Sequence, residues 1–406
     1  MPACRSRGDA VSKRGSEVEP TASHLEGPRP VTSSPVTAPA VESAAWRAAT
    51  TVIDLLTLVP DPRHARGKRH QLPAILAVIV AAVVTGATSA AAIGAYAQDV
   101  GADLLDRLGL GSKIPSEPTI RRVIEAMDQA MFARICGAWT RLRAEQISNQ
   151  LVIAVDGKTV RGARHHNDRA PHLVAALTHD TGLVLGQVQV DAKTNEIPAM
   201  IDLLRLMDLN NVVVTADALH TQTNTAKFIT QAGGDYVLTV KGNNPKLLAA
   251  LKDLPWKHVP SISQVDRRHG RRVRRTVQAV EVPAWIDYPG TRQVLRVRRT
   301  RTHHGKRSSE VVFLLCSKSM LQARPEQVAD WIQGHWHVEN RLHWVRDVSF
   351  DEDRQQLRTG NGPAVMAGMR NLAITLLRLA GWDNIAEACR HHSRHLERTV
   401  KLLLTT

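Results

Sequence analysis

The spacing of apolar residues divides the chain into a helical first part and a second part rich in short strands. From residue 46 to about 148, apolar side chains recur every three or four positions, most clearly in 102–110, 119–127 and 132–147. This is the period of a helix that buries one face. The pattern therefore predicts a helical amino-terminal domain over residues 46–148.

At Leu151 the pattern changes to short runs of Val, Leu and Ile bounded by Gly, Asn and Asp, which are typical of strands. Five such runs are LVIAVDGK, HLVAALTH, LVLGQVQV, NVVVTAD and DYVLTVK. The first three follow closely, as in an antiparallel meander, whereas helical patterns at 196–209 and 221–232 separate the later ones, as parallel strands require. This is the order of an RNase H-like mixed sheet, so the predicted fold class is α/β with helices on both faces.

A strongly basic, β-like insertion interrupts this second part at about 254–320. Residues 267–307 hold 13 Lys or Arg and two acids, a charge of +11, within a chain of 406 residues whose formal net charge is +15. Alternation along a strand puts basic residues on both faces, so at least one face meets solvent or phosphate. A solvated hairpin is the alternative, but this density of one sign favours DNA backbone binding, and we expect contacts from Arg271, Arg274 and Arg298.

Two further stretches bear on the class of protein. Residues 1–45 hold six prolines, no aromatic residue and equal numbers of acids and bases, which predicts a disordered tail and no signal peptide. Residues 71–98 carry no charge, long enough to span a bilayer, but Thr85–Ser89 breaks the run and predicts two buried helices instead. Four cysteines without paired spacing indicate neither a disulfide scaffold nor a zinc module, so we expect a soluble, cytoplasmic protein with no membrane partner.

Three acidic residues are candidates for a shared site. Asp156 and Asp217 each follow an apolar strand, and the first and fourth strands of the expected sheet are parallel neighbours, which brings both acids to one edge. Glu339 lies on a predicted helix, 335–346, that can pack across that edge. Taken singly, such acids cap turns or face solvent. Together they suit Mg²⁺, with Mn²⁺ as a substitute, and phosphodiester chemistry.

Longer stretches connect this pattern with a known family. The chain resembles insertion-sequence transposases of the DDE type, in the group of H-repeat-associated proteins, over nearly everything after the tail. The resembling segments are DPRHARGKRHQLPAILA, IPSEPTIRRVIEAMD, VIAVDGKTVRGA, VDAKTNEIPAMIDLLRLMDL, VVVTADALHTQ, GGDYVLTVKGNNPKL and HWHVENRLHWVRDVSFDED. The resemblance implies an RNase H-like catalytic domain over 149–406 that acts on DNA ends, with Asp156, Asp217 and Glu339 as catalytic and metal-binding residues.

The resemblance also bears on DNA contacts. Matching by position places His335 and Arg346 on the last helix, at spacings of four and seven from the third acid. These spacings put all three on one helical face, so we expect both residues to take a cationic role toward phosphate. Lys158 and Arg161, just after the first acid, are also expected to touch DNA.

Some alternatives stay open at the level of sequence. Relatives carry Tyr where Ile332 stands and Glu where Val273 stands. The helix that follows Ser116 carries Arg121 and Arg122 and is either a DNA recognition helix or an ordinary capped surface helix. Histidines at 335, 337 and 343 do not have the spacing of a zinc site on one helix. A second acidic cluster competes with the third acid and is interpreted as a loop or supporting group: Asp347, Asp351, Glu352 and Asp353.

Three functions fit these observations. The first is a transposase that binds the terminal inverted repeats of its own element, cleaves them with Mg²⁺ and joins the freed 3′ hydroxyl to target DNA. It would work as a homodimer or higher oligomer in a synaptic complex, associated with the nucleoid. The second is a decayed or domesticated DNA-binding protein. The third is an RNase H-like nuclease that cuts without joining.

Overall fold

The computed structural model describes residues 48–406 except 112, 165–169, 192–193 and 269–270. The tail predicted at residues 1–45 lies outside the described residues. Helices fill the first part of the described chain, as the apolar spacing predicts. They are α2 (Val52–Thr57), α3 (Leu72–Val84), α4 (Ala90–Asp99), α5 (Ala102–Arg107), α6 (Glu117–Ala126) and α7 (Gln129–Ile147).

The uncharged run 71–98 forms α3 and α4, with a break between them where the sequence predicts one. All of α3 except Pro73 is buried. A helix that is apolar on all sides belongs in the middle of a helical core, because any exposed face would be apolar surface in water. No helix in the described ranges is long and apolar enough to cross a membrane.

The five predicted strands are present and pair as predicted. They are β1 (Leu151–Thr159), β2 (His172–Thr178), β3 (Val184–Gln189), β4 (Val212–Ala216) and β5 (Asp235–Val240). Antiparallel pairs join β1 to β2 and β2 to β3, whereas β4 runs parallel to β1 and β5 runs parallel to β4. Two helices, α8 (Glu196–Arg205) and α9 (Thr223–Gln231), make the crossovers.

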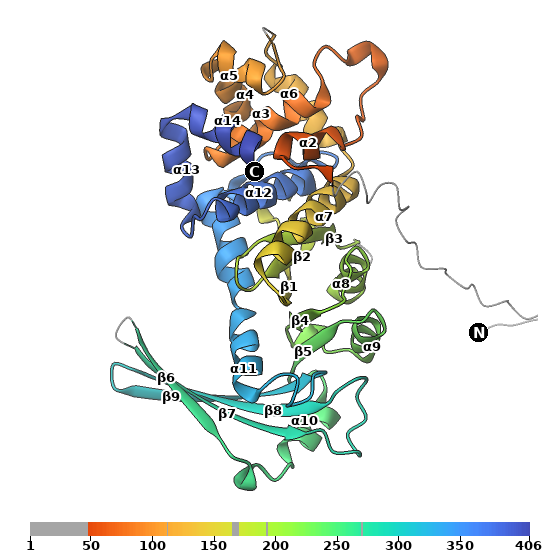
Figure 1. The fold of residues 1–406 in the computed structure, drawn as a ribbon, viewed down its shortest axis with the longest axis vertical. Helices are drawn as coiled ribbons and strands as arrows, with labels where there is room; N and C mark the ends of the chain where they lie inside the picture. The colour runs from red at the N-terminus through yellow and green to blue at the C-terminus, as the bar shows by residue number, and fades with distance from the viewer. Residues whose placement is uncertain (1–47, 112, 165–169, 192–193, 269–270) are drawn as a thin grey trace, which may run out of the picture. The chain divides into compact units, whose positions relative to one another are not determined.

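The basic insertion is β-rich, as predicted, and extends the main sheet. After α10 (Pro245–Lys252) its strands are β6 (Ile262–Arg268), β7 (Arg271–Glu281), β8 (Gln293–His303) and β9 (Lys306–Cys316). Strand β9 pairs antiparallel with β5, so one nine-stranded sheet results, in the order β3-β2-β1-β4-β5-β9-β8-β7-β6. Figure 1 shows these long strands beside α11 (Pro325–Gly334).

The two faces of the sheet have separate cores. Ile153 and Val155 of β1 pack with α8 and α9, whereas Ala154 between them belongs to the helical core on the opposite face. Side chains alternate along a strand, so the even-numbered positions that follow Ala154 point to the helical side. This alternation decides where Asp156 and Lys158 lie.

The helical core joins the two ends of the described chain. Its buried side chains come from α2 to α7 and also from α12 (Gly362–Leu379), α13 (Ile385–Arg394) and α14 (Leu396–Thr405). Figure 1 shows α13 and α14 next to the first helices, and the described residues belong to one compact unit. Helices on both sides of the boundary predicted at residue 148 therefore share this core.

The predicted helix at 335–346 has an unusual winding. After α11 ends, the chain continues through two π-helical segments, η5 (Glu339–His343) and η6 (Val345–Ser349), and the short turn η7 (Glu352–Arg354). A π-helix bonds residue i to i+5 and takes more residues per turn than an α-helix. Residues seven apart consequently no longer share a face.

Candidate functional site

The last residues of β1 point alternately to the two faces of the sheet. Asp156 and Lys158 point to the side where η5 and η6 pack, and Gly157 between them points to α8. A Cβ at Gly157 would lie 2.5 Å from both Glu196 Oε2 and His172 Nε2. The glycine therefore leaves room for this pair of side chains against the strand.

Asp156 meets two residues of η5. The Nδ1 atom of His343 lies 3.1 Å from Glu339 Oε2, to which it donates a hydrogen bond, and 3.6 Å from Asp156 Oδ2. One potential ligand atom from each of the three residues lies within 4.8 Å of the other two. The π-helical winding places Glu339 and His343, four residues apart, on the same face toward β1.

The pair of Lys158 and Asp347 continues this site. The Lys158 ammonium lies 2.6 Å from both oxygens of Asp347, and its side chain is only 9% exposed. Asp347 is one of the acids that compete in the sequence for the third position. It lies four residues after His343, binds a lysine and is not part of the group of three ligand atoms.

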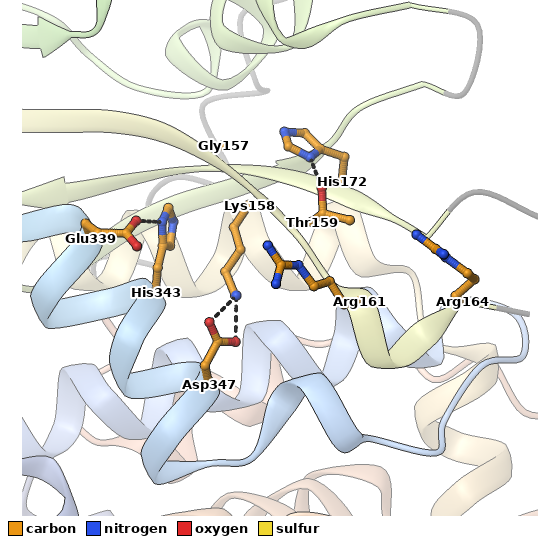
Figure 2. A pocket seen from close by; sticks show the side chains of 9 residues that line it. All are labelled: Gly157, Lys158, Thr159, Arg161, Arg164, His172, Glu339, His343 and Asp347. Carbon is orange, nitrogen blue, oxygen red and sulfur yellow. Dashed lines mark hydrogen bonds and ion pairs between the residues drawn. The ribbon is translucent and has the colours of Figure 1, made fainter.

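A polar cavity of about 850 Å³ opens over these residues. Figure 2 shows Glu339, His343 and Asp347 on one side and Lys158 opposite Asp347. The lining residues are Gly157, Lys158, Thr159, Arg161, Arg164, His172, Glu339, His343 and Asp347. Carboxylates and cations thus share one cavity, an arrangement suited to a metal ion beside phosphate groups.

The second predicted acid lies on the neighbouring strand. Asp217 directly follows β4, and the parallel register pairs Val155 with Ala216, so Asp156 and Asp217 are the next residues at the same edge. Asp217 is exposed, and its carboxylate accepts a 2.9 Å hydrogen bond from the Leu219 amide at the start of η3 (Ala218–His220). It does not join the group of three ligand atoms.

At Asp156 and Glu339, burial and the neighbouring His343 shift the carboxyl pKa in opposite directions. Burial raises the pKa of Asp156, with further upward contributions from Asp217 and Glu196, while His343 acts to lower it. The hydrogen bond from His343 holds the pKa of Glu339 below its usual value. A partly buried carboxylate with acidic neighbours gains from a cation that neutralises it.

The donor set suits a divalent cation. Two carboxylates and an imidazole nitrogen converge, and His343 Nε2 is buried without a hydrogen-bond partner among the described residues. Carboxylates suit Mg²⁺ and Mn²⁺, whereas an imidazole ligand favours transition metals such as Mn²⁺ over Mg²⁺. The sequence prediction assigns no role to His343, because it considers the three histidines only as a zinc site. Its spacing of four from Glu339 was the usable signal.

A second carboxylate network lies on the other side of Gly157. Glu196 Oε1 is 2.7 Å from His172 Nε2, and Glu196 Oε2 is 3.5 Å from Nε2 of the buried His220. The two nearby imidazoles, His172 first, lower the pKa of Glu196 to about 2. Thr159 contacts the other ring nitrogen of His172 at 2.8 Å. These contacts hold the end of β1 next to α8.

Arg346 is not available to DNA in this structure. Its side chain is fully buried and pairs with the equally buried Glu352, with Nη2 2.7 Å from Oε2. The predicted phosphate contact is therefore corrected to an internal ion pair. The physical reason is the π-helical winding, which turns Arg346 away from the face that carries Glu339.

His335 also departs from its predicted cationic role. Its Nδ1 lies 3.2 Å from the hydroxyl of Thr215 on β4. Burial lowers the pKa of His335 to about 4, although Asp217 acts to raise it. The imidazole is consequently neutral at physiological pH and packs against the sheet, so the expected charge toward phosphate is absent.

The predicted basic residues of the insertion are exposed. Arg271, Arg274 and Arg298 all face solvent. Register and alternation place Arg271 on the face of β7 that packs against α11 further along, and Arg274 and Arg298 on the opposite face. Lys158 and Arg161 line the cavity. The basic side chains thus lie on both faces of the extended sheet, as predicted.

The arginines of α6 are engaged within their own helix. Ser116 is the N-cap residue but makes no side-chain cap hydrogen bond. Arg121 pairs with Glu117 one turn earlier, and Arg122 donates to the Pro118 carbonyl. Both arginines are exposed, so the two alternatives that the sequence allows for α6 stay open.

Comparison with known proteins places the chain among mobile-element proteins. Residues 147–376 match the family described as Transposase DDE domain, and residues 53–140 match the region described as DDE_Tnp_1-associated. The chain is 32% identical to "Putative transposase YncI" of Escherichia coli O157:H7, over 80% of this chain and 87% of that protein. It is 31% identical to "H repeat-associated putative transposase YhhI" of Escherichia coli K12, over 80% and 90%.

A solved structure, a cryo-EM piggyBac transposase synaptic complex with hairpin DNA, matches at 13% identity and a TM-score of 0.40, covering 90% of this chain and 81% of that one.

Proposed function

Because the chain belongs to the Transposase DDE domain family, we propose that it cleaves DNA at the terminal inverted repeats of its own insertion sequence and joins the freed 3′ hydroxyl to target DNA. The catalytic and metal-binding residues are Asp156, Asp217 and Glu339, on an RNase H-like sheet. The observation that carries this proposal is the convergence of Asp156 and Glu339, from distant parts of the chain, beside a cavity lined with cations.

Asp156 and Glu339 would hold the divalent cation, Mg²⁺ or in its place Mn²⁺, with His343 beside them. Asp217, exposed at the end of the adjacent strand, would complete the set. A bound cation would activate the attacking hydroxyl and stabilise the charge on the leaving oxygen. The surrounding residues position DNA: Lys158 and Arg161 line the cavity and bind phosphates next to the acids.

The extended sheet supplies a second DNA surface. Arg271, Arg274 and Arg298 are exposed on strands that start from the same sheet as Asp156 and Asp217. These arginines cannot act as metal-binding carboxylates. They contribute instead to the affinity for the DNA backbone and to the salt dependence of that affinity. Two DNA ends must be held for joining, which implies a homodimer or a larger synaptic complex. Since its partner is DNA, the complex would be located at the nucleoid.

A cleavage and strand-transfer assay tests this function. The substrate is DNA that carries the sequences flanking the gene, with Mg²⁺ or Mn²⁺, and the variants are Asp156→Asn and Glu339→Gln. Glu397→Gln is the matched control, because Glu397 is a helical carboxylate, 75% exposed, on α14. We expect cleaved and joined products from the wild type and the control, and neither from the two variants.

The other outcomes identify the rival functions. Cleavage without any joined product would identify a nuclease. Binding of correctly identified ends without cleavage by the wild type would identify a DNA-binding protein that has lost its chemistry. Normal cleavage by Asp156→Asn would show that the catalytic residues lie elsewhere.

A further inference from the structure

The sheet stops pairing the two strands of the candidate site just before their aspartates. The last pair between β1 and β4 is Val155 with Ala216. After it, β1 continues beside β2 as far as Thr159, whereas the chain after Asp217 turns into η3. Two carboxylates that share a Mg²⁺ ion must each place an oxygen about 2.1 Å from it. The separation of Asp156 and Asp217 therefore depends on contacts beyond the β1–β4 ladder.

The carboxylate of Glu196 contacts both of these strand ends. Its Oε2 lies 3.5 Å from Nε2 of His220, the last residue of η3, which comes three residues after the second aspartate. Its Oε1 lies 2.7 Å from Nε2 of His172. The Nδ1 of His172 is 2.8 Å from the hydroxyl of Thr159, three residues after the first aspartate (Figure 2). One carboxylate thus connects the segments that follow the two aspartates.

Glu196 itself is firmly placed. It is the first residue of α8, where a carboxylate interacts favourably with the helix dipole. The side chain of Asn195 caps this helix by accepting a hydrogen bond from the Ile197 amide, and the buried Met200 and Leu203 pack α8 on the sheet. The carboxylate is therefore a fixed point against which both strand ends can be held.

The two histidines depend on this carboxylate. His220 is fully buried, and neither of its ring nitrogens makes a hydrogen bond among the described residues, so Glu196 serves as its ion-pair partner. A buried polar group that loses such a partner costs free energy. The Glu196–His172 contact, for its part, occupies the space that a side chain at Gly157 would fill. Loss of the Glu196 carboxylate would thus release both histidines together.

Glu196 lies near the metal-binding acids without being one of them. Its charge contributes to the raised pKa of Asp156, yet it does not belong to the group of three ligand atoms found among the described residues. We propose that Glu196 is a positioning residue, which acts through the two histidines to fix the separation of the two aspartates. It thereby sets the affinity of the carboxylate site for a divalent cation. This inference rests on the proposed function.

Binding of Mn²⁺ to the full chain without DNA tests the proposal, with electron paramagnetic resonance to separate free from bound ion. The variants are Glu196→Gln, His172→Ala and both together. Asp202→Asn is the matched control for charge, because it removes an exposed carboxylate from the same helix. Val400→Ala is the control for stability, because it truncates a fully buried side chain on α14.

We expect Glu196→Gln to weaken Mn²⁺ binding about tenfold, as loss of a contact that orients metal ligands does. His172→Ala should lose part of this affinity, and the double variant no more than Glu196→Gln alone, because both changes break one chain of contacts. Both controls should bind Mn²⁺ like the wild type, although Val400→Ala unfolds at a lower temperature. In the metal-free protein, the Leu219 amide, which donates to Asp217, should exchange faster in Glu196→Gln than in Asp202→Asn.

The histidine variant separates positioning from a simple charge effect. Loss of the negative charge at Glu196 would by itself weaken cation binding, but loss of an imidazole next to it would leave that binding equal or make it tighter. Weaker Mn²⁺ binding by His172→Ala is therefore expected from positioning alone. Since His172 is partly exposed, this variant also carries the test if Glu196→Gln proves too unstable to purify.

Equal Mn²⁺ affinities of the wild type and Glu196→Gln would overturn the inference. Unchanged or tighter binding by His172→Ala would overturn it too, as would a loss in Val400→Ala as large as that in Glu196→Gln. If Asp156→Asn binds Mn²⁺ like the wild type and still cleaves DNA, the proposed function fails as well. If the wild type binds Mn²⁺ and cleaves DNA while both variants of the Glu196–His172 contact behave like it, only this inference fails.

Discussion

The two sides of the segment η5–η6 use similar residue types for opposite purposes. On the inner side Arg346 and Arg370 bind Glu352, and all three side chains are fully buried. On the outer side, Lys158 binds Asp347 at the wall of a cavity. The inner cluster is closed to solvent, whereas the outer one can exchange its partners. A charged residue near a candidate site is therefore informative only when its burial is known.

Burial also separates the electrostatics of the two sides. At Glu352, burial acts to raise the pKa, but Arg346 and Arg370 outweigh it and hold the pKa below the usual value. At Asp156, burial prevails and the pKa is raised. The inner carboxylate already has its cations, while the outer one is short of positive charge. Of these two carboxylates, the outer one is therefore the one that a bound cation would stabilise.

The largest effect is expected from Asp156→Asn. Removal of this carboxylate should reduce metal-dependent DNA cleavage at least about a thousandfold, since metal catalysis supplies several kcal/mol. DNA affinity measured in EDTA should change little. The metal-free variant should unfold at an equal or higher temperature, because burial already disfavours the charged form. Unchanged cleavage by Asp156→Asn, or loss of its DNA binding, would contradict the assignment of Asp156 to a metal-binding site on the outer side.

Glu352→Gln should be the most destabilising single change in the inner cluster. It leaves Arg346 and Arg370 buried without a carboxylate, which typically costs about 3–5 kcal/mol in free energy of unfolding. Urea denaturation measures the loss. Glu397→Gln serves as the control, since Glu397 is 75% exposed and lies 3.6 Å from Arg107. A loss below 1 kcal/mol for Glu352→Gln would mean that the cluster behaves like a surface ion pair.

Glu196→Gln should show a smaller effect with a defined pH dependence. The pKa of Glu196 is lowered from 4.5 to about 2 by His172 and His220, so its ionised form stabilises the fold. A lowered folded pKa means that this contribution is complete above the unfolded value and is lost as the pH falls from about 4.5 to 2. At pH 7 the variant should lose about 1–3 kcal/mol. Unfolding free energies of variant and wild type that keep a constant difference down to pH 2 would refute this.

Asp347→Asn should have the smallest effect, and of opposite sign. Loss of the carboxylate frees the Lys158 ammonium for a phosphate, so DNA affinity should rise a few-fold, and more at low salt, where charges are less screened. Asp202→Asn breaks an exposed ion pair with Arg205 on α8, outside the cavity lining, and should leave affinity unchanged. Titration of labelled duplex DNA at two salt concentrations measures the difference. Weaker DNA binding by Asp347→Asn would mean that Asp347 positions Lys158 rather than competing with phosphate.

The strands near the site could be predicted from the sequence, because each depends on a local pattern. The five apolar runs formed β1 to β5 with the expected pairing. Since β1 and β4 are parallel neighbours, two acids that directly follow apolar runs had to reach one edge. The basic insertion was also predictable as β-rich, because its alternation is visible in the sequence. These features need no knowledge of distant contacts.

Three features of the site depend on contacts between distant segments. The prediction for Arg346 was wrong because it assumed α-helical spacing, whereas η5 and η6 wind as π-helix and bury this residue with Glu352. His343 lies 3.6 Å from Asp156 because η5 packs against the end of β1, a contact between segments far apart in the sequence. The insertion strands join the main sheet through the pairing of β9 with β5.

The sequence by itself therefore determined the types of the main elements, the order of the first five strands and the two aspartates at one edge, because these follow from local periodicity. Only the tertiary structure decided which side chains of the last helical segment meet β1 and which arginine is buried. The physical reason is that helical winding responds to packing on both sides of the segment. A small change in residues per turn moves a side chain from the solvent to the core.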